Sequence, residues 1–163
     1  MKNFMKEYLP YVIILILVLL IKQFVVTPIR VNGTSMADTL HNGDIMILNE
    51  TSYYFDSPKR FDIVVVKYQN EYLIKRVIGL PGEVVEYKDN KLYIDGKFVE
   101  EKFYHEATED FKIEALGDSK YFVLGDNRIN SMDSRMIGPV SKKTIRGKTS
   151  FTIFPFKRFG KKN

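Results

Sequence analysis

Two segments of the sequence carry side chains that could together break an amide bond. Ser35 lies in residues 33–40, just after a predicted strand and two positions after Gly33. A serine in such a turn can offer its hydroxyl as nucleophile and its own backbone N–H to the developing oxyanion. The same Gly-Thr-Ser tripeptide is also common in ordinary turns, so this segment alone is a weak signal.

The candidate general base is Lys75, in residues 74–83. Period-two alternation places it on one strand face with Leu73 and Val77. A lysine accepts a proton only when neutral, and at its ordinary pKa near 10.4 about 0.04% is neutral at pH 7. Burial on an apolar face can lower a lysine pKa by about 3–5, which would make Lys75 a usable base. The alternative, a lysine that extends its amine into solvent, is the commoner outcome.

A third segment, residues 125–139, places polar groups between a predicted strand and a Gly-Pro pair. It repeats an acid-x-Arg spacing suited to ion pairs that brace a loop, in Asp126, Arg128, Asp133 and Arg135. Ser131 adds a hydroxyl that could hold an amine in place. A solvated loop rich in turn-forming residues is the alternative interpretation.

The elements that must position these side chains are predicted to be strands. Runs rich in Val, Ile, Tyr and Phe occur at 29–31, 44–48, 63–68, 72–78, 83–87, 92–94, 121–124 and 144–154. Turn-forming pairs such as Asn42-Gly43 and Pro81-Gly82 separate them. Residues 101–118 are acidic and less regular, which indicates a surface excursion. The pattern predicts an all-β, antiparallel catalytic domain over residues 28–163.

The N-terminal segment is predicted to be a membrane anchor. Residues 9–21 are continuously apolar, and a helix over 8–26 would have about 19 residues and a length of about 28 Å, close to the thickness of a bilayer core. A buried core helix and a cleaved secretory signal are the alternatives, but no small-x-small cleavage site follows the run. Residues 1–27 are therefore expected to form a cytoplasmic stub and a single transmembrane helix, although the flanking lysines do not fix its orientation.

Composition excludes several kinds of site. The 163 residues include no cysteine, which rules out disulfides, thiol nucleophiles and thiolate metal sites. His41 and His105 are 64 positions apart without an HExxH pattern, so no metal or cofactor is expected. The net charge of +5 comes without a basic helix, so no nucleic-acid partner is expected.

Taken together and in this order, the three segments and the Gly43-Asp44 turn resemble the conserved boxes of bacterial type I signal peptidases. The resemblance runs over nearly the whole chain. It implies coiled antiparallel sheets on the extracytoplasmic side of the cell membrane, with the amino terminus in the cytoplasm. It also implies a membrane-bound serine endopeptidase that cleaves N-terminal signal peptides from exported preproteins, with signal peptides, membrane lipid and export machinery as partners.

The resemblance also implies a role for individual residues. By position, Ser35 is the nucleophile, Lys75 the general base, and Ser131 the hydroxyl that orients the lysine. The positions that support the dyad and its loop are Asp126, Arg128, Asp133 and Arg135. The positions expected to line shallow pockets for small substrate side chains are Val31, Met36, Leu40 and Ile74.

Two positions depart from the family pattern. Asp38 stands where many members have proline, and its carboxylate could cap the following turn. Gly33 stands where some relatives have a serine that donates to the oxyanion, so the second donor has no candidate. A Ser–His–Asp site built on His41 would leave the Lys75 segment without a purpose.

Two other functions compete with this interpretation. A self-cleaving repressor with a Ser–Lys dyad would need a DNA-binding module, for which residues 1–27 leave no room. A catalytically silent, membrane-tethered binding or scaffold relative is the alternative from another functional class.

Overall fold

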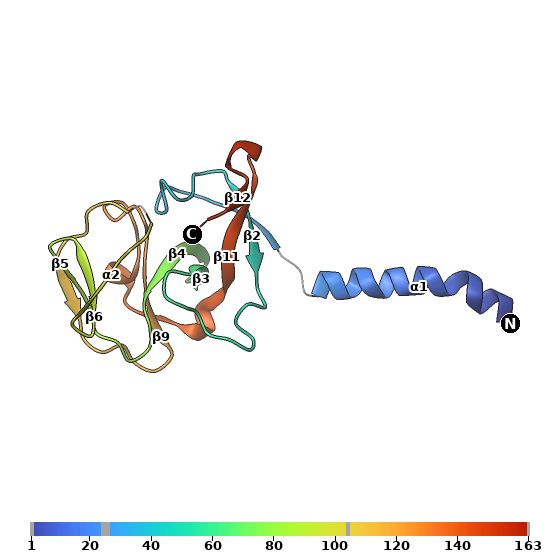
Figure 1. Cartoon of the computed structure of the whole chain (residues 1–163), viewed down its shortest axis with the longest axis horizontal. Helices are drawn as coiled ribbons and strands as arrows, with labels where there is room; N and C mark the ends of the chain where they lie inside the picture. The colour runs from blue at the N-terminus through green and yellow to red at the C-terminus, as the bar shows by residue number, and fades with distance from the viewer. Residues whose placement is uncertain (1, 24–26, 104, 163) are drawn as a thin grey trace.

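The structure, a computed structural model, describes residues 2–23, 27–103 and 105–162. After the N-terminal helix α1 (Lys2–Gln23), the chain forms two antiparallel sheets (Figure 1). The larger sheet contains, in spatial order, β1 (Thr27–Arg30), β2 (Ile45–Asn49), β11 (Ile145–Phe154), β3 (Ile63–Tyr68), β4 (Glu71–Gly79), β9 (Lys120–Leu124) and β10 (Val140–Ser141), with β12 (Gly160–Lys161) paired to β11. The smaller sheet contains β7 (Lys97–Val99), β6 (Lys91–Ile94), β5 (Val85–Lys88) and β8 (Phe111–Ile113). A short helix α2 (Ser134–Ile137) and the 3-10 turns η1 (Lys142–Thr144) and η2 (Phe156–Arg158) complete the fold.

The predicted antiparallel β class is confirmed, with one correction in the acidic excursion. Residues 101–118 contain β8, which pairs with β5, and they bury Thr108 and Leu116. A three-residue strand flanked by charged residues has too short a pattern to be recognised, and its pairing with a neighbour decides its structure. Residues 101–118 are therefore partly packed into the domain and do not lie wholly on its surface.

Three apolar clusters hold the domain together. The smaller sheet packs on β4 and β9 through residues such as Tyr87, Leu92 and Phe122. A separate cluster, which contains Met36 and Leu40, lies beneath the turn that carries Ser35. The turn that carries Ser35 thus packs on an apolar cluster and does not depend on its own hydrogen bonds alone.

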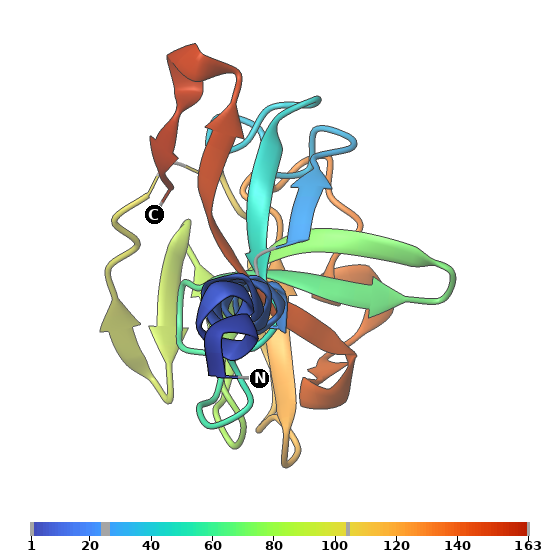
Figure 2. The same cartoon turned by 90° about the vertical axis from the view of Figure 1, so that its right-hand side faces the viewer.

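Two strands present free edges to each other. β4 pairs with β3 from Glu71 to Arg76 but with β9 only from Arg76 onward, so residues 71–75 have a partner on one side among the described strands. β1 ends the larger sheet on the other side. Figure 2 shows the green β3–β4 hairpin projecting below the blue strand β1. A groove between these edges leads to the candidate site.

Helix α1 extends away from the domain in Figure 1. Its side chains from Tyr8 to Val18 are apolar except for the tyrosine hydroxyls, and all are exposed. Within the part of the chain that the structure describes, no helix combines the length and apolar character needed to cross a bilayer. Residues 24–26, which complete the predicted span, lie outside the described residues.

Candidate active site

Ser35 lies in a compact turn that follows β1. The Ala37 N–H donates to the Thr34 carbonyl at 2.9 Å, and the Leu40 N–H donates to the Met36 carbonyl at 2.7 Å. Ser35 itself is half-buried, and among the described residues no group accepts a hydrogen bond from its backbone N–H. A donor left unused beside a nucleophile is available to an oxyanion.

Lys75 lies next to this serine. Its Nζ is 2.6 Å from Ser35 Oγ, and the residue is only 2% exposed. Burial lowers the pKa of Lys75 to about 8, although the charges of Asp133 and Asp126 act to raise it. About 9% of the amine is then neutral at pH 7, roughly 200 times more than for an ordinary lysine. The arrangement can therefore abstract the proton of a serine hydroxyl.

The loop from Gly125 onward contacts the nucleophile directly. The Asn127 N–H donates to the Ser35 carbonyl at 3.1 Å. A Cβ at Gly125 would lie 2.2 Å from Ser131 Oγ and 2.4 Å from the Ser35 carbonyl oxygen, so only glycine fits at this position. The loop and the serine turn are packed backbone against backbone.

Ser131 is close to the dyad but forms no bond to it. Its Oγ is buried and forms no hydrogen bond to Ser35 or Lys75, although its hydroxyl is among the groups that hold the pKa of Asp133 low. The orienting role expected for this hydroxyl therefore stays a prediction.

The ion pairs of the loop differ from the predicted ones at Asp126. Its carboxylate accepts from Arg76 at 2.9 and 2.7 Å, with both side chains fully buried, and from the Thr39 hydroxyl at 2.6 Å. The expected partner Arg128 instead donates to Glu101 at 2.8 Å. The sequence spacing shows which charges are near in the chain, but not which way each side chain points.

The second predicted pair forms. Arg135 donates to Asp133 at 2.9 and 2.8 Å, and the Gly125 N–H also donates to this carboxylate. Burial acts to raise the pKa of Asp133, but these donors outweigh it and hold the pKa below its ordinary value. Asp133 therefore remains a charged anchor for the loop.

Sequence reasoning missed two residues that support the site. Arg76 follows Lys75 and points to the opposite face of β4, where its guanidinium lies 3.9 Å from the Phe103 ring centre. Glu101, in the acidic excursion, binds Arg128 and lies 3.1 Å from His105 Nε2. The alternation that singled out Lys75 also puts Arg76 on the other face, but it gives no sign that this face is buried.

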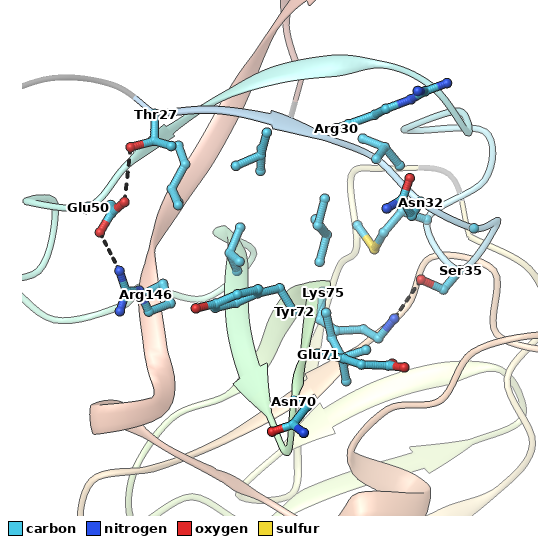
Figure 3. A pocket seen from close by; sticks show the side chains of 18 residues that line it. Thr27, Arg30, Asn32, Ser35, Glu50, Asn70, Glu71, Tyr72, Lys75 and Arg146 are labelled. Atoms are coloured by element: carbon cyan, nitrogen blue, oxygen red, sulfur yellow. Dashed lines mark hydrogen bonds and ion pairs between the residues drawn. The ribbon is translucent and has the colours of Figure 1, made fainter.

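A groove of about 750 Å³ runs from the dyad along β1 and β4 (Figure 3). Val31, Met36 and Ile74 line it, as predicted from the resemblance. Leu40 does not line it, because this side chain is fully buried in the cluster below the serine turn. Leu40 packs beneath the wall of the groove, and its role in substrate binding stays a prediction.

Asp38 lies on the exposed side of the serine turn. Its backbone has a φ of 71°, a left-handed conformation that aspartate tolerates and proline cannot adopt. Among the described residues its carboxylate accepts no hydrogen bond, so the cap suggested for it does not form.

Comparison with known proteins places the chain in a family. The family described as signal peptidase, peptidase S26, matches residues 4–154. The chain is 42% identical to signal peptidase I S of Bacillus subtilis, over 93% of this chain and 90% of that protein. It is 41% identical to a signal peptidase I of Bacillus licheniformis, over 98% and 94%. The crystal structure of a signal peptidase I from Enterococcus faecalis aligns with a TM-score of 0.53 and 36% identity, covering 57% of this chain and 97% of that one.

Proposed function

The chain belongs to the signal peptidase family, peptidase S26, and we propose that Ser35 and Lys75 carry out its chemistry. It is a signal peptidase I, a serine endopeptidase that removes signal peptides from preproteins. The observation that carries the assignment of the dyad is the 2.6 Å approach of a buried lysine amine to a serine hydroxyl.

The proposed reaction has two halves. Neutral Lys75 takes the proton of Ser35 Oγ while that oxygen attacks the carbonyl carbon of the scissile bond, and the Ser35 N–H donates to the resulting oxyanion. Lys75 then gives the proton to the departing amine, which leaves an ester between Ser35 and the signal peptide. In the second half Lys75 takes a proton from water, the hydroxide attacks the ester, and the proton returns to Ser35.

The peptide is proposed to bind extended between the two free edges. It would pair with the backbone of residues 31–34 on one side and 73–75 on the other, as in strand addition to a sheet. The N–H and carbonyl of Val31 already bond Asp44 and Gly43, so the free groups on the first side belong to residues 32–34. Val31, Met36 and Ile74 leave shallow apolar space beside the dyad, which would accept small side chains one and three residues before the cut.

The loop residues are proposed to hold this arrangement without taking part in proton transfer. Ser131 would orient the lysine amine. The residues that fix the loop through buried ion pairs are Asp126, Arg128, Asp133 and Arg135.

We further propose that the enzyme is anchored by one membrane-spanning segment in residues 1–27, with the catalytic domain on the extracytoplasmic side. The apolar, exposed side chains of α1 support this, since they pack on none of the three core clusters. Exposed Phe156 and Phe159, near the basic C-terminal residues, offer a second contact with lipid. Export machinery would deliver preproteins to this face.

Peptide cleavage by the purified full chain in detergent tests the dyad. The substrate has alanine one and three residues before the expected cut. Wild type should cleave there, while Ser35→Ala and Lys75→Met should each lose at least about 1,000-fold in kcat/KM. Lys67→Met, at an exposed strand position, is the matched control and should cleave like wild type. An intact peptide with folded wild type would favour the catalytically silent scaffold, and an active Lys75→Met would remove the lysine from the mechanism.

A further inference from the structure

Asp44 binds both ends of the segment that carries the nucleophile. Before Ser35, the Val31 N–H donates to the Asp44 carbonyl oxygen at 2.8 Å. After Ser35, the His41 N–H donates to the Asp44 carboxylate at 3.0 Å. Residues 31–41 therefore form a loop around the serine, and one aspartate closes it.

An arginine from the far end of the chain holds the Asp44 carboxylate. Arg158 donates to one of its oxygens from Nε at 2.9 Å and from a terminal nitrogen at 2.6 Å, while the other oxygen accepts from His41. Asp44 is fully buried, and among the described residues only Arg158 forms an ion pair with it. Burial acts to raise the pKa of Asp44, but the bonds from Arg158 and His41 outweigh it and hold the pKa below its ordinary value. The carboxylate therefore stays charged.

The turn that carries Arg158 is itself fixed to the larger sheet. η2 lies at the tip of the β11–β12 hairpin, and Figure 2 shows this red hairpin beside the cyan strand β2. Phe154, the last residue of β11, pairs with the residue that follows Asp44. After the turn, the ring of Phe159 meets that of Phe151 edge to face at 5.0 Å. Folded structure on both sides of η2 thus directs Arg158 to Asp44.

This support differs from the apolar packing beneath the serine turn. Met36 and Leu40 belong to a cluster whose members are all apolar, so the loss of Arg158 would leave that packing in place. It would leave the Asp44 carboxylate buried without a counter-charge. A carboxylate in that state turns toward water or takes up a proton, and either change weakens its bond to the His41 N–H. One end of the serine loop would then be free to shift.

We propose that Arg158 is a positioning residue, which holds Asp44 and through it the place of Ser35 beside its general base. This inference rests on the proposed function, because it takes Ser35 as the nucleophile. The Ser35 Oγ lies 2.6 Å from Lys75 Nζ, and a displacement near 1 Å at a reacting group is enough to lower a rate about 100-fold. The C-terminal turn therefore fixes the geometry of the dyad from the other end of the sequence.

Cleavage of a short soluble peptide by full-length variants tests this role. Arg158→Met should lower kcat about 10-fold to 100-fold, with KM within about threefold, because Arg158 is not among the residues that line the groove. Arg158→Lys should stay within about fivefold of wild type, since both arginine bonds reach one oxygen, which a single ammonium can also bind. Lys157→Met changes the exposed neighbour in the same turn and should cleave like wild type.

A double-mutant cycle shows whether Arg158 acts through Asp44. Asp44→Ala should lose at least as much kcat as Arg158→Met, because it also removes the acceptor of the His41 N–H. In the Asp44→Ala background, Arg158→Met should then change kcat by less than about threefold. If Arg158→Met lowers kcat by the same factor in both backgrounds, Arg158 does not act through Asp44 and the inference is wrong.

Thermal denaturation separates positioning from stability. With a merely structural role, Arg158→Met would have a lower Tm, but well below that Tm its kcat would stay within about twofold of wild type. That result would overturn the inference, while cleavage by wild type upheld the dyad. If Arg158→Met does not fold, Arg158→Gln, which removes the charge and keeps a hydrogen-bond donor, takes its place in the same comparison. An intact peptide with folded wild type would overturn both the inference and the proposed function.

Discussion

At the scale of single residues, the proposed mechanism depends on how strongly the Lys75 amine is desolvated. Lys75 has carboxylates within electrostatic reach, at Asp133 and Asp126, yet burial dominates and its pKa falls to about 8. Asp126 is paired with Arg76 and Asp133 with Arg135, so neither carboxylate is free to form an ion pair with the protonated lysine. The ion pairs of the loop thus help to keep the pKa of Lys75 low, so that more of the amine is neutral, as the proposed mechanism requires.

The pH dependence of cleavage should follow this lysine. The reactive form is neutral, so kcat/KM should rise about tenfold per pH unit below pH 7 and level off above about pH 8 to 9. The measurement is a pH–rate profile on a soluble peptide, with Lys67→Met as the control that should share it. An inflection near 10.4 would mean that Lys75 is solvated like a surface lysine.

The pH dependence of the free energy of unfolding gives an independent measurement of the Lys75 pKa. The unfolded chain keeps the Lys75 proton up to about pH 10.5, whereas the folded chain loses it near pH 8. Between these values the unfolded state binds more protons, so the free energy of unfolding rises with pH. Relative to Lys75→Met, wild type should gain about 3 kcal/mol from pH 8 to 10.5, measured by urea denaturation. A pH-independent difference between the two proteins would contradict the lowered pKa.

Gly125 packs against the Ser35 backbone with no room for a side chain. Gly125→Ala would put a methyl group 2.4 Å from the Ser35 carbonyl oxygen, and one of the two segments must move. We expect a loss of about 100-fold in kcat/KM, because a displacement near 1 Å at a reacting group is enough, and a destabilisation of about 1–3 kcal/mol. Gly117→Ala is the matched control, since its nearest atom would be 3.6 Å away. Full activity in Gly125→Ala would show that the packing of the loop does not position Ser35.

At the scale of elements, the acidic excursion secures the catalytic loop through one ion pair. Arg128 is fully buried and donates to Glu101, Tyr87 and Thr108. Burial acts to raise the pKa of Glu101, but His105, Arg128 and Tyr87 together hold it below its ordinary value, so the carboxylate stays charged. The excursion and the loop are therefore joined by a buried ion pair. If one partner is removed, the other charge stays buried, out of reach of water.

Glu101→Gln should accordingly destabilise the domain. Leaving Arg128 buried without a counter-charge costs about 3 kcal/mol, which thermal or urea denaturation would register as a clear shift. Glu100→Gln changes the exposed neighbour, whose contact with Lys102 is 3.6 Å, and should cost less than about 0.5 kcal/mol. Similar effects for the two variants would mean that the buried pair does not support the fold.

Elements differed in how far the sequence could predict them. The strand Ile63–Tyr68 was predicted with its observed bounds because its apolar run is long and flanked by polar residues. Phe111–Ile113 was not, because its three residues form a strand only beside β5.

In the site, Ser35 and Lys75 were identified by resemblance, but their contact and the pairing of Arg76 with Asp126, 50 positions away, depend on tertiary packing. The direction in which a charged side chain points decides its ion-pair partner. Spacing along a loop does not reveal that direction.

At the scale of the whole molecule, helix α1 and the β-sheet domain are separable in their packing. Every residue of the three core clusters lies after Thr27, and the dyad and its supporting ion pairs do as well. The domain therefore needs nothing from α1 to assemble its active site. What α1 would add is location, since tethering enzyme and preprotein to one membrane raises their effective concentration.

Comparing the full chain with residues 27–163 tests this division. Both should cleave a short soluble peptide with kcat/KM values within about twofold, because both contain the complete dyad and groove. Only the full chain should float with liposomes in a density gradient, and it should cleave a liposome-inserted preprotein at least about tenfold faster than the truncated form. Flotation of residues 27–163 to the same extent would assign membrane binding to the exposed C-terminal phenylalanines rather than to the helix. Equal rates of both forms on the inserted preprotein would show that tethering does not supply the substrate, and that encounter through solution is sufficient.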